Sequence, residues 1–231
     1  MHGVEGDVLP GKDDIAKTPF LHNPKRMARL AGYCDLFNPY QQGLTSYFTV
    51  NSAGPERLDA LGTAYCGKPL LAHEICIDGT FLDFSTEKLY PADSPVLKSG
   101  MFRESRRMLS EKGLLARSDL YFRNSNEWMR RQRKFTFEKI RASDRTAGYD
   151  FLGDINTQGV LYGYNVGLMD EFYRLKPGET VENVRRYNSA AVLLANFGSD
   201  FTVTAGTEKG VRFSISNYDR DFAEAELAVA L

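Results

Sequence analysis

The stretch KPLLAHEICI, residues 68–77, decides the fold class of this chain. Pro69 is tolerated at the first position of a strand, and the residues after it are almost all apolar. Such a run is what a parallel strand covered on both faces needs. Glu74, the one acid in the run, would be costly to bury unpaired. The pattern leaves two interpretations open: a strand end that opens into a polar pocket at Glu74, or a structural Glu74 paired with an arginine.

The segments around this strand alternate between strand and helix patterns. A short apolar run before it ends in the turn signal Asn38-Pro39, and long amphipathic stretches follow it. Alternation of this kind is typical of a parallel α/β fold. We expect strands at 33–40, 68–77 and 147–155, helices at 54–67, 101–112, 118–142 and 166–175, and a long loop at 78–100.

The C-terminal region has a different pattern. VRFSISN alternates strictly, with Val211, Phe213 and Ile215 on one face. Four short strands at this spacing, where a sandwich has about seven, indicate the start of a β-sandwich. About three βα units are likewise fewer than the eight of a barrel, so we expect the chain to be part of a longer protein. The four strands are expected at 190–198, 200–206, 211–217 and 225–231.

Composition excludes several classes of protein. The chain has 231 residues, 29 Lys and Arg against 30 Asp and Glu, and 42% hydrophobic residues, so neither a disordered tail nor a basic nucleic-acid-binding domain is indicated. Its three cysteines have no zinc or disulfide spacing. No apolar run reaches the roughly 18 residues of a membrane span, and the start of the sequence has no signal-peptide pattern. We expect no metal, no cofactor, no nucleic-acid partner and no membrane; compartment and oligomeric state stay open.

The stretch at 68–77 resembles a segment of family 2 glycoside hydrolases, the bacterial β-galactosidases and their relatives. That segment reads Lys or Arg, Pro, an aliphatic pair, two residues and Glu; it is the family's seventh barrel strand, and its Glu is the nucleophile. CDLFNPY, ending in Pro39-Tyr40, is similar to the sixth strand, and AGYDFLGDINTQG at 147–159 to the eighth strand and its loop. The likeness covers about residues 30–231.

The resemblance implies a fold and a chemistry. The fold is the last βα units of a (β/α)8 TIM barrel over residues 1–180, followed by an immunoglobulin-like β-sandwich portion over 188–231. The activity is retaining hydrolysis of terminal β-glycosidic bonds without a cofactor, and the partners are the carbohydrate and the N-terminal half-barrel of the parent chain. The implied catalytic residues are Glu74 as nucleophile and Tyr40 as its hydrogen-bond donor, and the implied sugar-binding residues are Asp154, Tyr149, His73 and Gln158.

Three departures from the family pattern matter. The eighth strand has no platform Trp, since the one Trp of the chain is Trp128. The Asp-Gly-Gln-Gly loop appears only as Asp154 with Gln158-Gly159. No Asn-Glu pair stands upstream of Glu74 to supply the general acid, because the pair at Asn126 lies downstream. Since retaining glycosidases need two carboxylates about 5–5.5 Å apart, we expect little or no turnover by this chain alone.

Other signals have competing interpretations. The whole chain could be a non-catalytic carbohydrate-binding or assembly module on a degenerate barrel, which the missing Trp favours. Adjacent strand residues face opposite ways, so His73 is expected to face the helix layer or the strand end rather than the sugar. Asp150 and Asp154, four apart, would share one face if the strand continued that far. The basic run at 130–134 is expected to be a solvated helix face rather than a nucleic-acid site.

Overall fold

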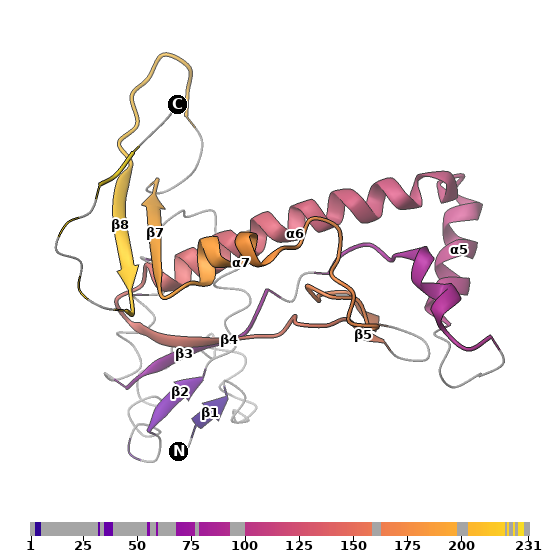
Figure 1. The fold of residues 1–231 in the computed structure, drawn as a ribbon, viewed down its shortest axis with the longest axis horizontal. Helices are drawn as coiled ribbons and strands as arrows, with labels where there is room; N and C mark the ends of the chain where they lie inside the picture. Colours follow the sequence, from indigo (N-terminus) through magenta and orange to yellow (C-terminus); the bar gives the residue numbers. More distant parts are fainter. Residues whose placement is uncertain are drawn as a thin grey trace, which may run out of the picture.

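The computed structural model of the chain describes residues 3–5, 32, 35–38, 55, 59, 68–76, 79–92, 100–158, 163–197, 203–219, 221, 224 and 226–228. Figure 1 shows an extended molecule in which a small sheet and a hairpin flank one end of a long helix. The described elements are β1 (Gly3–Glu5), β2 (Leu36–Asn38), β3 (Leu70–Ile75), the 3-10 helix η2 (Phe84–Leu89), α5 (Met101–Glu111), the 3-10 helix η3 (Leu115–Arg117), α6 (Ser118–Arg141), β4 (Thr146–Phe151), β5 (Thr157–Gln158), β6 (Gly163–Tyr164), α7 (Val181–Asn188), β7 (Ala191–Asn196) and β8 (Arg212–Asn217).

Strands β1 to β4 form one parallel sheet whose spatial order, β1-β2-β3-β4, is also the order of the sequence. A doubly wound sheet would reverse direction at a switch point, whereas the strands of a (β/α) barrel follow one another in this way. The four described strands form an open arc and do not close into a barrel. The order of the strands is the one expected of consecutive βα units. The partial TIM barrel stays a prediction, because the described strands do not close into a barrel.

The C-terminal half of α6 covers one face of this sheet. The ring of Phe137 lies edge-on to the rings of Tyr149 and Phe151 on β4, with centroids 4.9 and 5.6 Å away, and 5.0 Å from Tyr187 on α7. Edge-to-face aromatic pairs of this kind add about 0.5–1.5 kcal/mol each to the burial of their surface. Phe137 is 1% exposed, so it is the point at which the helix, the sheet and α7 meet.

The predicted helices at 101–112 and 118–142 are confirmed to within a residue or two. The predicted strands at 33–40 and 68–77 contain β2 and β3, and the one at 147–155 overlaps β4, which begins at Thr146 and already ends at Phe151. The predicted helix at 166–175 is wrong. Asp170 accepts hydrogen bonds from the backbone N–H groups of Phe172 and Arg174, and its second oxygen binds the Arg174 side chain. A short acidic side chain that bonds its own backbone competes with helix formation, so this segment makes a turn instead. Of the predicted helix at 54–67, only residues 55 and 59 are described.

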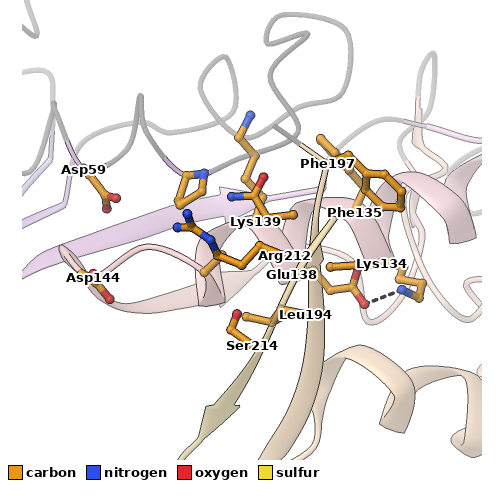
Figure 2. A pocket seen from close by; sticks show the side chains of 14 residues that line it. Asp59, Lys134, Phe135, Glu138, Lys139, Asp144, Leu194, Phe197, Arg212 and Ser214 are labelled. Carbon is orange, nitrogen blue, oxygen red and sulfur yellow. Dashed lines mark hydrogen bonds and ion pairs between the residues drawn. The ribbon is translucent and has the colours of Figure 1, made fainter. Parts of the chain in front are cut away.

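The C-terminal strands agree with the prediction only in part. β7 and β8 form an antiparallel pair, but the described residues 203–206 and 226–228 are not strand, and α7 was not predicted. Val192 and Leu194 are buried under α6, whereas Phe213 and Ile215, on the predicted apolar face, are 38% and 48% exposed. Figure 2 looks into the groove between this hairpin and α6.

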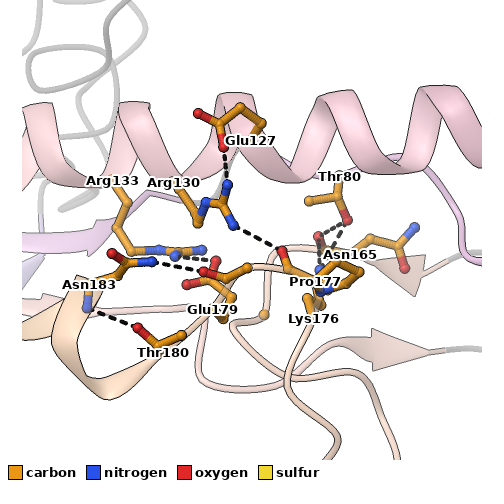
Figure 3. A network of polar contacts seen from close by, with 12 residues as sticks. Thr80, Glu127, Arg130, Arg133, Asn165, Lys176, Pro177, Glu179, Thr180 and Asn183 are labelled. Atoms are coloured by element: carbon orange, nitrogen blue, oxygen red, sulfur yellow. Dashed lines mark hydrogen bonds and ion pairs between the residues drawn. The ribbon is translucent and has the colours of Figure 1, made fainter.

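The basic run on α6 is not the fully solvated face that its composition predicts. Arg133 is 1% exposed, and its Nη1 donates to Oε1 of Glu179 at 2.8 Å in an ion pair that is buried on both sides (Figure 3). Arg130 bonds the carbonyl oxygen of Pro177 at 3.0 Å and pairs with Glu127. These arginines are engaged because the loop that carries Pro177 and Glu179 lies against α6. The periodicity of the sequence does not reveal such a long-range partner.

Candidate functional site

Glu74 lies near the carboxyl end of β3, inside a β-bulge. Ala72 of β3 pairs with Tyr149 of β4, and Ile75 pairs with Phe151, so two residues, His73 and Glu74, stand opposite the single residue Asp150. Bulges are over-represented next to active sites because the extra residue bends the strand and changes the direction of a side chain. The strict alternation that we used to orient His73 therefore does not hold across this point.

The backbone at this strand end is in a conformation that side chains rarely adopt. Glu74 has φ of 49° and Cys76 has φ of 62°, both in the left-handed region that favours glycine. Non-glycine residues held there cost on the order of 1–3 kcal/mol each, and they cluster at active sites and ligand clamps. Ile75, between them, is fully buried, which holds the strand in place while its two neighbours take up the strained conformation.

Asp150 is bonded to the strained segment. The N–H group of Glu74 donates to Oδ1 of Asp150 at 2.9 Å. The side chain of Asp150 therefore satisfies a backbone donor within the bulge. Tyr149 and Phe151, on either side of Asp150, both contact Phe137 of α6. Because side chains alternate along a strand, Asp150 points to the face of the sheet away from that helix.

The two carboxylates differ in exposure. Asp150 is exposed and Glu74 is half-buried. Glu74 is therefore partly exposed to solvent at this end of the sheet. Whether it faces a polar pocket or is a structural glutamate paired with an arginine stays open, and the backbone bond brings it next to Asp150.

Two further predicted sugar-binding residues, Tyr149 and Asp154, lie in β4 and just beyond its end. The hydroxyl of Tyr149 donates to Oδ1 of Asn188 at 2.5 Å, and its ring lies on Phe137, so it contacts α6 and α7. Burial, with a smaller contribution from Tyr218, raises the pKa of Tyr149. Asp154 is exposed beyond the end of β4, at a bend. Because the strand stops at Phe151, even spacing no longer places Asp154 on the same face as Asp150.

The remaining predicted residues are only partly described. His73 lies in β3 and Gln158 in β5, where it pairs with Gly163 of β6, and their side chains lie outside the described residues. Tyr40 lies outside them altogether. Their predicted roles stay predictions.

Sequence reasoning missed the contact between Asp150 and the backbone of Glu74. The position of Asp150 between two aromatic residues was a usable signal, because it predicts an acid that faces away from the helix layer. The bulge itself had no signal, since no glycine or proline marks it. It arises from the register of two strands about 75 residues apart in the sequence.

The described residues include no group of three or more His, Cys, Asp or Glu side chains able to hold a metal ion. Within the described part of the chain, no helix is both long enough and apolar enough to span a bilayer. A scan of the sequence against known protein families finds no matching family, and a search of curated proteins finds no relative.

Proposed function

We propose that this chain contributes the nucleophile of a retaining glycoside hydrolase similar to the bacterial β-galactosidases, and that Glu74 is that nucleophile. The observation that carries the proposal is the position of Glu74: it is half-buried near the carboxyl end of a strand in a parallel, sequence-ordered sheet. In parallel α/β folds the active site lies at this end of the strands. In this proposal residues 1–180 belong to a (β/α)8 barrel and residues 188–231 begin an immunoglobulin-like sandwich.

The mechanism is a double displacement. The carboxylate of Glu74 attacks the anomeric carbon, the bond from that carbon to the leaving oxygen breaks, and a second carboxylic acid gives its proton to that oxygen. Water, deprotonated by the same second carboxylate, then attacks the glycosyl–enzyme ester and releases Glu74. The sugar hydroxyls are assigned to Asp154, His73 and Gln158, and not to Tyr149, whose hydroxyl bonds Asn188 on the helix side of the sheet. A hydrogen bond to the nucleophile is assigned to Tyr40.

Asp150 fits a positioning role better than that of the acid. One of its oxygens accepts the N–H of Glu74, and this contact fixes the backbone on which the nucleophile stands. A carboxyl group that is held against the backbone of its neighbour is poorly placed to reach a leaving oxygen at each turnover. The general acid is therefore assigned to a residue other than Asp150, in the rest of the barrel.

Covalent trapping tests Glu74 independently of that acid. The chain is incubated with 2,4-dinitrophenyl 2-deoxy-2-fluoro-β-galactoside, whose leaving group departs without a proton, so the nucleophile alone is needed for the first step. We expect one fluoroglycosyl group on the peptide that contains Glu74, found by mass spectrometry. We expect no label on Glu74→Gln, and at least tenfold slower labelling of Asp150→Asn, which keeps its shape and loses its charge.

The outcomes separate the candidate functions. Label on another residue, or equal labelling of Glu74→Gln, would show that Glu74 is not the nucleophile. Galactose binding that is the same in the wild type and in Glu74→Gln, with no label in a chain whose circular dichroism is unchanged, would instead identify the carbohydrate-binding module.

A further inference from the structure

A cavity lined by described residues lies in the groove between α6 and the β7–β8 hairpin, and not at Glu74. Its volume is about 650 Å³, within the range of roughly 300–1,000 Å³ that small-molecule sites occupy. None of its described lining residues comes from β3. The lining comes from α6 and the turn after it, from the hairpin with Phe197, and from Pro55 and Asp59 (Figure 2).

One buried arginine fixes the two walls relative to each other. Arg141, at the C-terminus of α6, is 8% exposed. Its Nη2 donates to the carbonyl oxygens of Ala190 and Ser216 at 3.0 and 3.1 Å, its Nε donates to the Ser216 hydroxyl at 3.1 Å, and its Nη1 bonds the carbonyl oxygen of Ser189. Because the hairpin is bound to the helix at both strands, the groove is formed in advance of any ligand.

The hairpin presents one face to this groove. The pairs Leu194 with Ser214 and Asn196 with Arg212 lie on it, and all four residues line the cavity. Phe213 alternates with them and therefore points to the opposite face. This alternation supplies an apolar floor at Leu194 and hydrogen-bonding groups at the other three positions.

The charges of the cavity balance. Three acids, Asp59, Glu138 and Asp144, and three bases, Lys134, Lys139 and Arg212, line it. Lys134 and Glu138 pair with each other, and the Lys139 ammonium lies 5.5 Å from the centroid of the Phe135 ring. A cavity without net charge does not select a polyanion or a polycation, because either would meet like charges.

The ends of the cavity differ in chemistry. Figure 2 shows the rings of Phe135 and Phe197 together at one end, with the carboxylates of Asp59 and Asp144 at the other and Arg212 between them. A sugar has an apolar face of C–H groups that packs on an aromatic ring, and hydroxyl groups that both donate and accept hydrogen bonds. Carboxylates can accept from such hydroxyls and a guanidinium can donate to them.

We propose that this groove is a non-catalytic binding site for a neutral oligosaccharide. Phe135 and Phe197 hold the face of one sugar ring, and Arg212, Asn196 and Asp144 bond the hydroxyls of the next. The site does not depend on the proposed role of Glu74, since it shares no described residue with that strand end. The groove holds an oligosaccharide on the protein whether or not that oligosaccharide is cleaved at Glu74.

The test uses β-1,4-galactotetraose as the probe, with NMR chemical shifts and calorimetry as the readouts. In the wild type we expect binding in the millimolar range or tighter, with shifts at Asn196, Arg212 and Ser214. Arg212→Ala and Phe197→Leu should each weaken this binding at least fivefold. The matched controls Arg185→Ala, on exposed α7, and Phe213→Leu, on the opposite face of the hairpin, should leave it unchanged.

Each other outcome overturns the proposal. If the tetraose does not bind, or if the controls weaken binding as much as the groove variants do, the groove is not a sugar site. The same follows if the zwitterionic dipeptide Lys-Glu shifts these residues and the tetraose does not. Glu74→Gln must retain the shifts at the groove; loss of binding there on this change alone would place the sugar at Glu74 and not in the groove.

Discussion

Two regions of the molecule carry charged side chains in opposite ways. Where the loop at 165–179 meets α6, the charges are deeply buried and engaged: Arg133 pairs with Glu179, and Lys176 donates to Thr80 and to the carbonyl oxygen of Asn165 (Figure 3). Near the end of β3, Glu74 is half-buried and its backbone is strained. The difference teaches that deeply buried ion pairs hold the fold together, whereas the strand end combines a partly exposed carboxylate with a strained backbone.

The largest effect is expected from the buried ion pair. Glu179→Gln should lower the free energy of unfolding by about 3–5 kcal/mol, because it leaves the guanidinium of Arg133 buried without a counter-charge. The pair is already incompletely satisfied, since Nε of Arg133 and Oε2 of Glu179 find no hydrogen-bond partner in the described part of the chain. Urea unfolding followed by circular dichroism measures the change.

Two comparisons sharpen this prediction. The double variant Arg133→Met with Glu179→Leu should recover most of the loss, because it removes both charges from the interior. Glu111→Gln, which breaks the exposed pair with Arg107, should cost less than about 1 kcal/mol. A loss at Glu179 no larger than the loss at Glu111 contradicts the assignment of this region to the framework of the fold.

Lys176 should make stability depend on pH. Burial, and after it the nearby Arg133, lower the pKa of Lys176 to about 7, whereas the unfolded chain has the ordinary value near 10.5. Between these values the unfolded state binds the proton and the folded state does not, so stability rises with pH from 7 to about 10. Lys176→Met removes the amine. The carbonyl oxygen of Asn165 still accepts hydrogen bonds from the backbone N–H and the hydroxyl of Thr80 in this variant.

The variant should therefore be more stable than the wild type by on the order of 2 kcal/mol at pH 7 and below. This advantage should shrink as the pH rises towards 10, where the wild-type amine is neutral in the folded state and becomes neutral in the unfolded one. Thermal unfolding of both proteins at pH 6, 8 and 10 provides the measurement. A constant difference across this range would mean that Lys176 keeps its proton in the folded protein.

The sequence predicted what local patterns control. The helices at 101–111 and 118–141 and the strands around Phe37, Ala72 and Tyr149 follow from periodicity and apolar runs, because each is decided by the residues within it. Residues 166–175 were mispredicted for a local reason that was visible in principle, since Asp170 bonds to the backbone that follows it.

The position of Glu74 in a strand was predictable, and its geometry was not. An acid in an otherwise apolar strand marks Glu74 as a candidate from the sequence alone, and its role stays a prediction. The bulge, the left-handed backbone and the bond to Asp150 depend on how β3 and β4 pair, and a one-residue shift of register would remove all three. The buried partner of Arg133 was hidden for the same reason, since Glu179 is 46 residues away in the sequence.

The smallest effect bears most directly on the comparison, because it concerns the strain at Glu74. Glycine adopts a φ of 49° without a steric cost, so Glu74→Gly should raise the free energy of unfolding by about 1 kcal/mol. Glu74→Gln keeps a side chain in the same conformation and should change it by less than about 0.5 kcal/mol. Both changes remove the proposed nucleophile, and both should abolish fluoroglycosyl labelling. A variant that is more stable and yet inert would show that the strand end is strained for chemistry, since function is commonly maintained at some cost in stability. If Glu74→Gly instead destabilises the protein by more than 1 kcal/mol, the carboxylate contributes to the fold as the buried pair does, and the distinction between the two regions fails.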